Sequence, residues 1–272
     1  MDKEETTDKC IVTSQHPPGT VFTSFPDGHW VPSHRHDQAQ LLYAIEGVLV
    51  IGTATGRWVL PSNRALWIPP NTEHWTRMVG AVQLRSLYLQ HLQAPRMPAH
   101  CCVVEVSPLL RELILSAPGI REPFSADTRS EWIMKLLVDE LDCTPLHAMH
   151  LPVPNHPKLA HVCNLLIESP QLDLAECAVL LAVNPKTLRR WFMDDLGMTF
   201  GKWRRQARLQ LALEYLAKGE SVLGVAIATG YANHSAFSAM FRNELGVSPV
   251  EFITHRRRAD QLATGRSAAH LS

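Results

Sequence analysis

The sequence predicts a multidomain α+β protein, with an N-terminal antiparallel β-barrel and flanking helices followed by an all-α domain. In that second domain we expect two helix-turn-helix units joined by a linker helix. Three observations support this prediction. The 272 residues exceed the usual size of one compact domain. Short apolar runs separated by Gly, Pro and Asn fill residues 20–90, whereas apolar residues at spacings of three and four dominate beyond residue 157.

The N-terminal half is predicted to contain the barrel, in residues 13–100, and then two helices. Residues 107–117 and 130–142 have helical apolar spacing, with Ser107 and Ser130 as N-caps. We assign residues 101–145 to a helical segment for coupling or dimerisation. Its second helix carries an apolar stripe that packs on the barrel or forms a dimer seam, composed of Trp132, Ile133, Leu136, Leu137 and Leu141.

A proline-rich stretch separates the two halves. Four prolines lie in residues 145–157 without a usable periodicity, so residues 146–157 are predicted as the linker. The helical domain then occupies residues 158–258. The polar ends, residues 1–12 and 259–272, are expected to be flexible tails.

The C-terminal half contains an internal repeat at a constant offset of 49 residues. Identical residues recur at this offset and conservative pairs lie between them, so one supersecondary unit is used twice. The identical pairs are Leu174 with Leu223, Asn184 with Asn233, Phe192 with Phe241, Leu196 with Leu245, and Gly197 with Gly246. The conservative pairs are Thr199 with Ser248, Leu188 with Phe237, and Val183 with Ala232.

Each copy of the repeat has the layout of a helix-turn-helix unit. The first helices are predicted at 174–181 and 222–228, each followed by a break of three or four residues. The second helices begin near Pro185 and His234, after the N-caps Asn184 and Asn233. Gly230 lies in the second turn. Gly197 and Gly246 are suited to left-handed C-caps.

An amphipathic helix between the copies, residues 203–217, is predicted to end at Gly219. Fifteen helical residues span roughly 22 Å. With the widths of the two units added, the helix could hold them about one DNA turn apart, roughly 34 Å. The alternative is an all-helical bundle in which the repeat is purely architectural.

Charge distribution favours DNA as the partner of the second half. Residues 1–156 contain 12 Lys and Arg against 16 Asp and Glu, while residues 157–258 contain 13 against 9. An acidic part joined to a basic part suggests that only the basic part meets a polyanion. The start of the chain lacks a signal peptide and no apolar run is long enough to cross a membrane, so we expect a cytoplasmic protein.

The six cysteines (Cys10, Cys101, Cys102, Cys143, Cys163 and Cys177) show no CxxC spacing. In a reducing compartment they are predicted to be unpaired thiols. Neither a disulfide framework nor a zinc ribbon is expected.

Residues 158–255 resemble the DNA-binding domain of the AraC/XylS family of regulators. The resemblance rests on NPKTLRRWFMDDLGMTFGKWRRQARLQLALEYLAKG and VAIATGYANHSAFSAMFRNELGVSPVEF. It implies that bases are read from the two second helices, and Ala239 departs from the longer side chains common in the family. The implied DNA-facing residues are Lys186, Thr187, Arg189, Arg190, Asn233, His234, Ser235 and Ser238, with Arg189 as the best candidate. A further set of arginines could contact DNA phosphates, or could form a basic face that contacts only solvent. These are Arg204, Arg205, Arg208 and residues 256–258.

Histidines form a second constellation, in the predicted barrel. Alternate side chains of a strand share one face, so His34, His36 and Gln40 can point into the interior, where His74 could join them. These spacings resemble the two motifs of the cupin fold, which hold a divalent metal. Gln40 stands where the usual ligand is glutamate. The resemblance implies a zinc, nickel, cobalt, copper or iron ion, while the alternative is a polar pocket for an organic effector. Tyr43 and Trp67 are assigned to the wall of an effector pocket.

Together these features predict a transcription regulator and not an enzyme. The expected partners are promoter or operator DNA, a metal or small-molecule effector, RNA polymerase and a second copy of the chain, with no membrane. One alternative is a cupin metalloenzyme with an accessory DNA-binding domain, in which His34, His36 and His74 hold a catalytic metal. Another is a metal-independent sensor that controls an adjacent efflux transporter gene.

Overall fold

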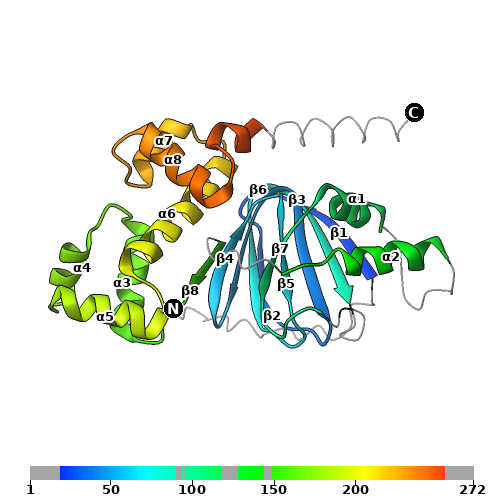
Figure 1. The fold of residues 1–272 in the computed structure, drawn as a ribbon, viewed down its shortest axis with the longest axis horizontal. Coiled ribbons are helices and arrows are strands. Elements are labelled where there is room, and N and C mark those ends of the chain that lie inside the picture. The colour runs from blue at the N-terminus through cyan, green and yellow to red at the C-terminus, as the bar shows by residue number, and fades with distance from the viewer. Residues whose placement is uncertain (1–18, 90–93, 95, 118–127, 144–148, 255–272) are drawn as a thin grey trace, which may run out of the picture.

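The computed structural model describes residues 19–89, 94, 96–117, 128–143 and 149–254. An antiparallel β-domain is followed by a helical domain, as the sequence predicts (Figure 1). The predicted tails, residues 1–12 and 259–272, lie outside the described residues, and so does Cys10.

In its described residues, the N-terminal domain is built on one sheet of eight strands in which every pairing is antiparallel. The strands are β1 (Gly19–Phe25), β2 (Trp30–His34), β3 (Ala39–Thr53), β4 (Gly56–Leu60), β5 (Arg64–Ile68), β6 (His74–Leu89), β7 (Cys102–Glu105) and β8 (His150–Pro152).

Two long strands, β3 and β6, pair along their whole lengths and change their outer partners halfway. The first part of β3 pairs with β5 and the last part with β4, while β6 pairs first with β2 and then with β1. The β3–β6 register shifts around Gly47, which has a φ of +78°. A Cβ at Gly47 would lie 2.6 Å from the carbonyl oxygen of Ala81, so the bend requires glycine.

Bending at these shifts curls the sheet. His74 and Tyr88 lie fourteen residues apart on β6, which would separate them by about 46 Å on a straight strand. Both rings nevertheless lie with their centroids 5.2 Å from that of His36. The curled sheet therefore has an interior, as a barrel requires.

Two strands lie in segments for which the sequence predicts no strand. β7 falls within residues 101–145, the predicted helical segment, and pairs with β5. β8 falls within the predicted linker, 146–157, and pairs with residues 56–58 of β4. Prolines are tolerated there because β8 is a short strand at the edge of the sheet.

Two helices, α1 (Pro108–Ser116) and α2 (Arg129–Asp139), follow the sheet. Ser107 caps α1, as predicted. The prediction of Ser130 as the cap of α2 is wrong, because the Thr128 hydroxyl accepts the backbone N–H of Glu131 and the helix begins before Ser130. Of the predicted stripe, Leu137 and Leu141 are buried, Ile133 is partly buried, and Trp132 and Leu136 are exposed.

The helical domain contains six helices among the described residues before a last helical stretch at 249–254. They are α3 (Pro157–Glu168), α4 (Leu174–Leu180), α5 (Pro185–Leu196), α6 (Phe200–Ala217), α7 (Val222–Ala228) and α8 (His234–Leu245). The linker helix α6 begins three residues earlier than predicted, because Thr199 caps it. Asn184 and Asn233 cap α5 and α8, and Gly197 and Gly246 end them in left-handed conformation, as predicted.

The repeat holds, but its offset is not constant. α5 and α8 align at 49 residues, whereas α4 and α7 align at 48, since they begin at Leu174 and Val222. The predicted pairing of Leu174 with Leu223 is therefore wrong. The breaks are four and five residues long, so the second unit has one extra residue after the left-handed turn residue, which is Ala182 in the first unit and Gly230 in the second.

The two domains share part of one apolar core. A cluster that includes strand residues such as Leu49 and Ile51 also contains Leu209, Leu213 and Leu216 of α6. A second cluster lies between the sheet and α1 and α2, and a third fills the first helix-turn-helix unit. In Figure 1, α6 runs along one side of the sheet, while α1 and α2 lie on the other.

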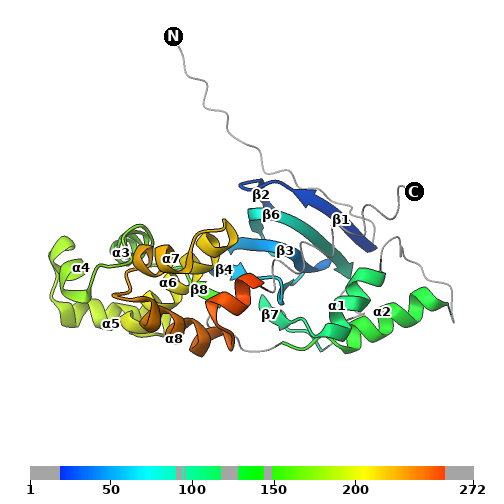
Figure 2. The same cartoon turned by 90° about the horizontal axis from the view of Figure 1, so that it is seen from above.

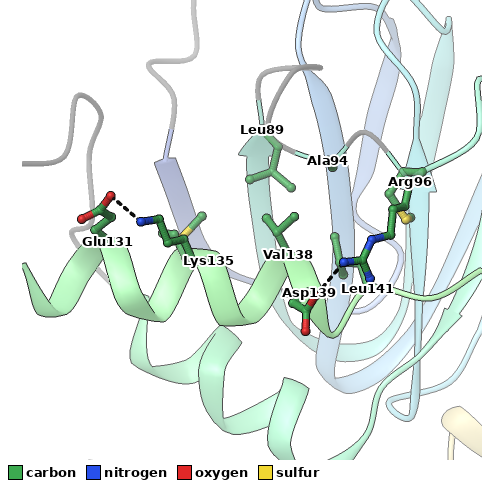
Figure 3. A pocket seen from close by; sticks show the side chains of 10 residues that line it. Leu89, Ala94, Arg96, Glu131, Lys135, Val138, Asp139 and Leu141 are labelled. Carbon is green, nitrogen blue, oxygen red and sulfur yellow. Dashed lines mark hydrogen bonds and ion pairs between the residues drawn. The ribbon is translucent and has the colours of Figure 1, made fainter. Parts of the chain in front are cut away.

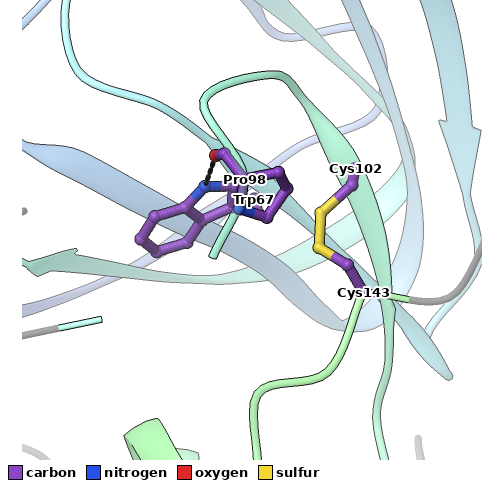
Figure 4. The surroundings of a disulfide bond; sticks show 4 residues. All are labelled: Trp67, Pro98, Cys102 and Cys143. Carbon is purple, nitrogen blue, oxygen red and sulfur yellow. Dashed lines mark hydrogen bonds between the residues drawn. A yellow bond between two sulfur atoms is a disulfide. The ribbon is translucent and has the colours of Figure 1, made fainter. Parts of the chain in front are cut away.

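The prediction that all cysteines are unpaired is wrong for two of them. Cys102 and Cys143 form a disulfide, with Cα atoms 6.0 Å apart, next to Trp67 and Pro98 (Figure 4). A β-bridge between Val104 and Cys143 brings the two cysteines together across 41 residues. Among the described residues Cys101, Cys163 and Cys177 are free.

Candidate DNA-binding surface and histidine site

Helix α5 is divided into a buried face and a cationic face. Leu188 and Phe192 are fully buried in the core of the first unit. Lys186, Arg189 and Arg190 are exposed, and Thr187 is half-buried. Three basic side chains on one exposed helix can reach base edges or phosphates.

Helix α8 has an equivalent core but a different exposed surface. Phe237 and Phe241 are fully buried. His234, Ser235 and Ala239 are exposed. Two other predicted DNA-facing residues belong to this unit. The amide oxygen of Asn233 caps the helix by accepting the backbone N–H of Ala236 at 2.8 Å, and the hydroxyl oxygen of Ser238 is buried.

Helix α6 sets the separation of the two units. Its 18 residues span about 27 Å, with the α4–α5 unit near its start and the α7–α8 unit near its end (Figure 1). In Figure 2 α5 and α8 both lie along the lower edge of the helical domain, whereas α3 and α7 lie along the upper edge. The two second helices of the repeat therefore lie on one side of the domain.

Arginines of the linker helix have different surroundings. Arg208 is buried, donates two hydrogen bonds to the carbonyl oxygen of Pro170 (2.8 and 2.6 Å) and lies over the ring of Tyr231. It joins the two helix-turn-helix units and is not a surface contact, so its assignment to DNA phosphates was wrong. Arg205 is exposed and 3.8 Å from Glu244, and Arg204 lies over Phe200. Residues 256–258 lie outside the described residues.

The curled sheet brings His34, His36 and His74 together. His34 and His74 are register partners on β2 and β6, and their ring centroids are 4.4 Å apart. Each histidine can place one ring nitrogen within 4.8 Å of the others. His36 and His74 are buried and His34 is half-buried.

Backbone carbonyls fix the tautomer of all three rings. Nδ1 of His34 lies 2.9 Å from the carbonyl oxygen of Pro32. Nδ1 of His36 lies 2.6 Å from that of Gln38, and Nδ1 of His74 lies 2.9 Å from that of Thr72. A carbonyl can only accept, so each Nδ1 carries the hydrogen and the neutral ring keeps its lone pair on Nε2. Burial lowers the pKa of His74 to about 4, so this ring is neutral at physiological pH.

Gln40 completes the cluster. Its side-chain nitrogen donates to the hydroxyl oxygens of Ser86 (3.1 Å) and Tyr88 (3.2 Å). Its oxygen consequently faces Nε2 of His36 at 3.2 Å. Burial raises the pKa of Tyr88 to about 12, which keeps its hydroxyl protonated.

Tyr43 and Trp67, predicted to line an effector pocket, lie in the apolar cluster beneath α1 and α2. Tyr43 donates its hydroxyl hydrogen to the carbonyl oxygen of Ser62 at 2.9 Å, and the Trp67 ring N–H donates to that of Pro98 at 3.0 Å. Both side chains are almost fully buried.

Comparison with known proteins agrees with this architecture. Residues 18–129 match the model of an AraC-like ligand binding domain and residues 177–255 match that of a helix-turn-helix domain. The HTH-type transcriptional regulator NimR of Escherichia coli (strain K12) is 33% identical over 224 residues, which cover 82% of each chain. The chain belongs to the AraC/XylS family of transcriptional regulators.

Other comparisons cover different shares of this AraC-family chain. RipA of Corynebacterium glutamicum, also an HTH-type transcriptional regulator, is 32% identical over 136 residues, which cover 49% of the chain and 39% of RipA. The crystal structure of ToxT from Vibrio cholerae covers 87% of the chain and 97% of ToxT, at 11% identity and a TM-score of 0.36. The matched domains and the relative NimR are those of a regulator, so the chain is a DNA-binding transcriptional regulator with a ligand-binding domain.

A partly buried ion cluster fastens α6 of this regulator to the sheet. One carboxylate oxygen of Glu214 accepts from Arg57 on β4, and the other accepts from Arg77 on β6 at 2.7 Å. Burial lowers the pKa of Arg57, an effect that the Glu214 carboxylate opposes. We call Arg57, Arg77 and Glu214 the α6 clamp. Sequence reasoning missed it, although a glutamate between the apolar residues Leu213 and Leu216 was a signal that the helix buries a charge.

Polar contacts beside the clamp extend the domain contact. The side-chain amide of Gln210 donates to the carbonyl oxygens of Met149, at 3.1 Å, and of Arg57, at 3.4 Å. Among the described residues, no helix has the length and apolar composition needed to cross a bilayer.

Proposed function

We propose that this regulator binds operator DNA with α5 and α8 together, and that a metal ion or small molecule in the N-terminal domain controls that binding. The observation that carries the proposal is the position of α6. This one helix separates the two DNA-facing units and is fastened to the sheet by the α6 clamp. A change in the sheet can therefore reach both units through one rigid element.

The DNA contact is proposed to be unequal between the units. Lys186, Arg189 and Arg190 supply direct base readout and phosphate neutralisation from α5. From α8, His234 and Ser235 supply the exposed polar contacts, whereas Asn233 positions the helix start. Arg204 and Arg205 are proposed to contact phosphates beside α5. Thr187 stays a prediction.

Footprinting of the intergenic DNA beside the gene tests this proposal. We expect protection of two adjacent major-groove segments and an affinity that falls steeply with salt. Specific binding should exceed binding to random DNA by at least a thousandfold. Equal affinity for both would overturn the proposal. The genes that flank the protected DNA then show whether the operator adjoins a transporter gene, which we infer as a target.

The effector proposal is a divalent transition metal held by His34, His36 and His74 with the oxygen of Gln40. The ring nitrogens of the three histidines, which lie within 4.8 Å of one another, and the Gln40 oxygen, 3.2 Å from Nε2 of His36, support it. A bound ion would supply a positive charge that links β2, β3 and β6. Zinc, nickel, cobalt, copper and iron all suit three imidazoles and one amide oxygen, and an uncharged organic effector in the same interior is the second candidate.

Metal analysis of the purified protein, after exposure to each ion in turn, distinguishes these candidates. We expect close to one ion per chain, and less than a tenth of that in a His34→Ala variant. His161→Ala is the control, since His161 is exposed on α3. Equal retention in both variants, or no retention in the parent protein, would leave only the organic effector.

The α6 clamp is proposed to carry the signal. Arg77 follows His74 by three residues on β6, so the clamp and the histidine cluster share a strand. In Glu214→Gln we expect DNA binding to persist while its response to metal is lost, because the neutral side chain keeps its shape but not its charge. Glu220→Gln, at an exposed position just after α6, is the matched control. A full metal response in Glu214→Gln would contradict this role.

We further propose that the regulator acts as a homodimer in the cytoplasm, with RNA polymerase as a partner. Leu109 on α1 and Trp132 and Leu136 on α2 are exposed, and they supply an apolar face for the second copy. Sedimentation of the protein and of Trp132→Asp tests the dimer, which the substitution should weaken. A coupling role for residues 101–145 stays a prediction.

A further inference from the structure

The N-terminal domain has a second cavity, which lies apart from the histidine cluster and is lined by none of its residues. It is a pocket of about 440 Å³ between α2 and the end of β6, shown in Figure 3. Neighbouring side chains of β6 point to opposite faces of the sheet. Leu87 and Leu89 face α1 and α2, whereas Ser86 and Tyr88 face Gln40 in the interior. The sheet therefore separates this pocket from the histidine cluster.

The walls of the pocket are apolar, and its volume lies within the range of small-molecule sites, roughly 300–1,000 Å³. Two of the wall residues, Met97 and Met134, are flexible and polarisable, so the wall can adapt to different apolar shapes. The apolar lining consists of Leu89, Ala94, Met97, Met134, Val138 and Leu141.

The rim is charged but balanced. Arg96 pairs with Asp139 at 3.0 Å, and Lys135 pairs with Glu131 at 2.8 Å (Figure 3). Each cation thus already has its carboxylate, and a charged ligand would have to replace one of these pairs. The rim consequently favours a ligand without net charge.

A neighbouring hollow lengthens the site. It has a volume of about 560 Å³ and shares Arg96, Met97, Asp139 and Leu141 with the first. Its other walls are more polar and lead towards the disulfide, and they consist of Pro98, His100, Asp142 and Cys143. A molecule that fills both hollows would have an apolar body and a polar end.

We propose that this pocket binds an elongated, uncharged small molecule with its apolar body against Met97 and Met134 and its polar end beside Arg96 and Asp139. The apolar body would be held by removal of its surface from water. The uncharged polar end would accept from Arg96 or donate to Asp139 without breaking their ion pair. The site is independent of the proposed metal site.

Titration of the full chain with the neutral fluorescent probe N-phenyl-1-naphthylamine tests the proposal. We expect saturable binding of one probe per chain. Val138→Trp, which fills the pocket, should weaken binding at least tenfold. Arg129→Trp places the same ring at an exposed position in the first turn of α2, outside the pocket, and should leave binding within twofold. Weakening by Arg129→Trp and not by Val138→Trp would place the probe on the exposed face and overturn the proposal.

Two further measurements keep the test decisive if Val138→Trp fails to fold. With methionine methyl groups labelled with ¹³C, the probe should shift the signals of Met97 and Met134 but not that of Met193, which is exposed on α5. The anionic probe 1-anilinonaphthalene-8-sulfonate should bind at least tenfold more weakly than the neutral one. Unshifted Met97 and Met134 signals, or tighter binding of the anion, would overturn it. His34→Ala should bind the neutral probe normally, which separates this site from the metal proposal.

Discussion

The two helix-turn-helix units have the same framework and unequal surfaces. Each second helix begins at a capping asparagine, ends at a left-handed glycine, and is anchored by aromatic or aliphatic residues four positions apart. Their exposed residues differ, since α5 carries three cations where α8 carries His234, Ser235 and Ala239. The two copies therefore share the residues that form the helix ends and the core of the unit, and they differ in the exposed residues that are proposed to face DNA.

The equivalence of the two cores gives the largest expected effect. Phe192→Ala and Phe241→Ala each remove a fully buried ring, so each should lower the free energy of unfolding by about 3–5 kcal/mol. Chemical denaturation of the full chain measures this. Met193→Ala, at an exposed position of α5, should cost less than about 0.5 kcal/mol. A large loss in only one of the two phenylalanine variants would show that the units are not equally built.

The inequality of the two surfaces gives the next effect. Arg189→Ala should weaken binding to the footprinted fragment by about 1–3 kcal/mol, which is roughly 5- to 150-fold, because a base contact is lost. Ser235→Ala should change the affinity by less than about threefold. Fluorescence anisotropy of labelled DNA measures both, with Arg129→Ala on α2 as a control for loss of charge. If the two variants lost equal affinity, α5 would not dominate.

The caps should again behave alike. Asn184→Ala and Asn233→Ala each remove a side chain that accepts a backbone N–H at 2.8 Å, so each should cost about 1 kcal/mol of stability. Thermal unfolding followed by circular dichroism measures the two losses. Glycine at either position should restore most of the stability, and a failure to do so would assign the loss to something other than the cap.

Adding a cation to α8 should reduce the difference between the surfaces. Ala239 is exposed, and Ala239→Arg should steepen the slope of log affinity against log salt by about one, as expected for one extra phosphate contact. Affinity for random DNA should rise together with specific affinity. An unchanged slope would mean that this part of α8 does not face the backbone of DNA.

Local chemistry explains what the sequence could predict. Caps, left-handed glycines and helical spacing depend on a few neighbouring residues, so the fold class and most helix bounds of the C-terminal domain could be predicted. The one-residue difference between the two turns was missed because Leu223 matches Leu174 by identity, although it is exposed on α7. Sequence identity does not reveal which of two adjacent leucines faces the core.

Long-range proximity explains what could not be predicted. The Cys102–Cys143 disulfide, the edge strand β8 and the burial of Arg208 all depend on segments that meet only in the folded chain. The α6 clamp joins residues up to 157 positions apart. The histidine cluster is a partial exception. His34 lies on β2 and Gln40 on β3, as strand alternation requires, but His36 falls between the two strands, so the single strand that the sequence predicted through all three is not formed.

The shared core has a consequence for how the two halves can be exchanged or isolated. Cutting the chain before α3 would leave Leu209, Leu213 and Leu216 of α6 without the strands that cover them, beside an unneutralised Glu214. The DNA-binding domain produced alone would then expose an apolar face of α6 and tend to aggregate. A chimaera that joins a different sensor domain to this DNA-binding domain should stay in solution only when the new sensor supplies an apolar surface that covers these leucines and two arginines that pair with Glu214.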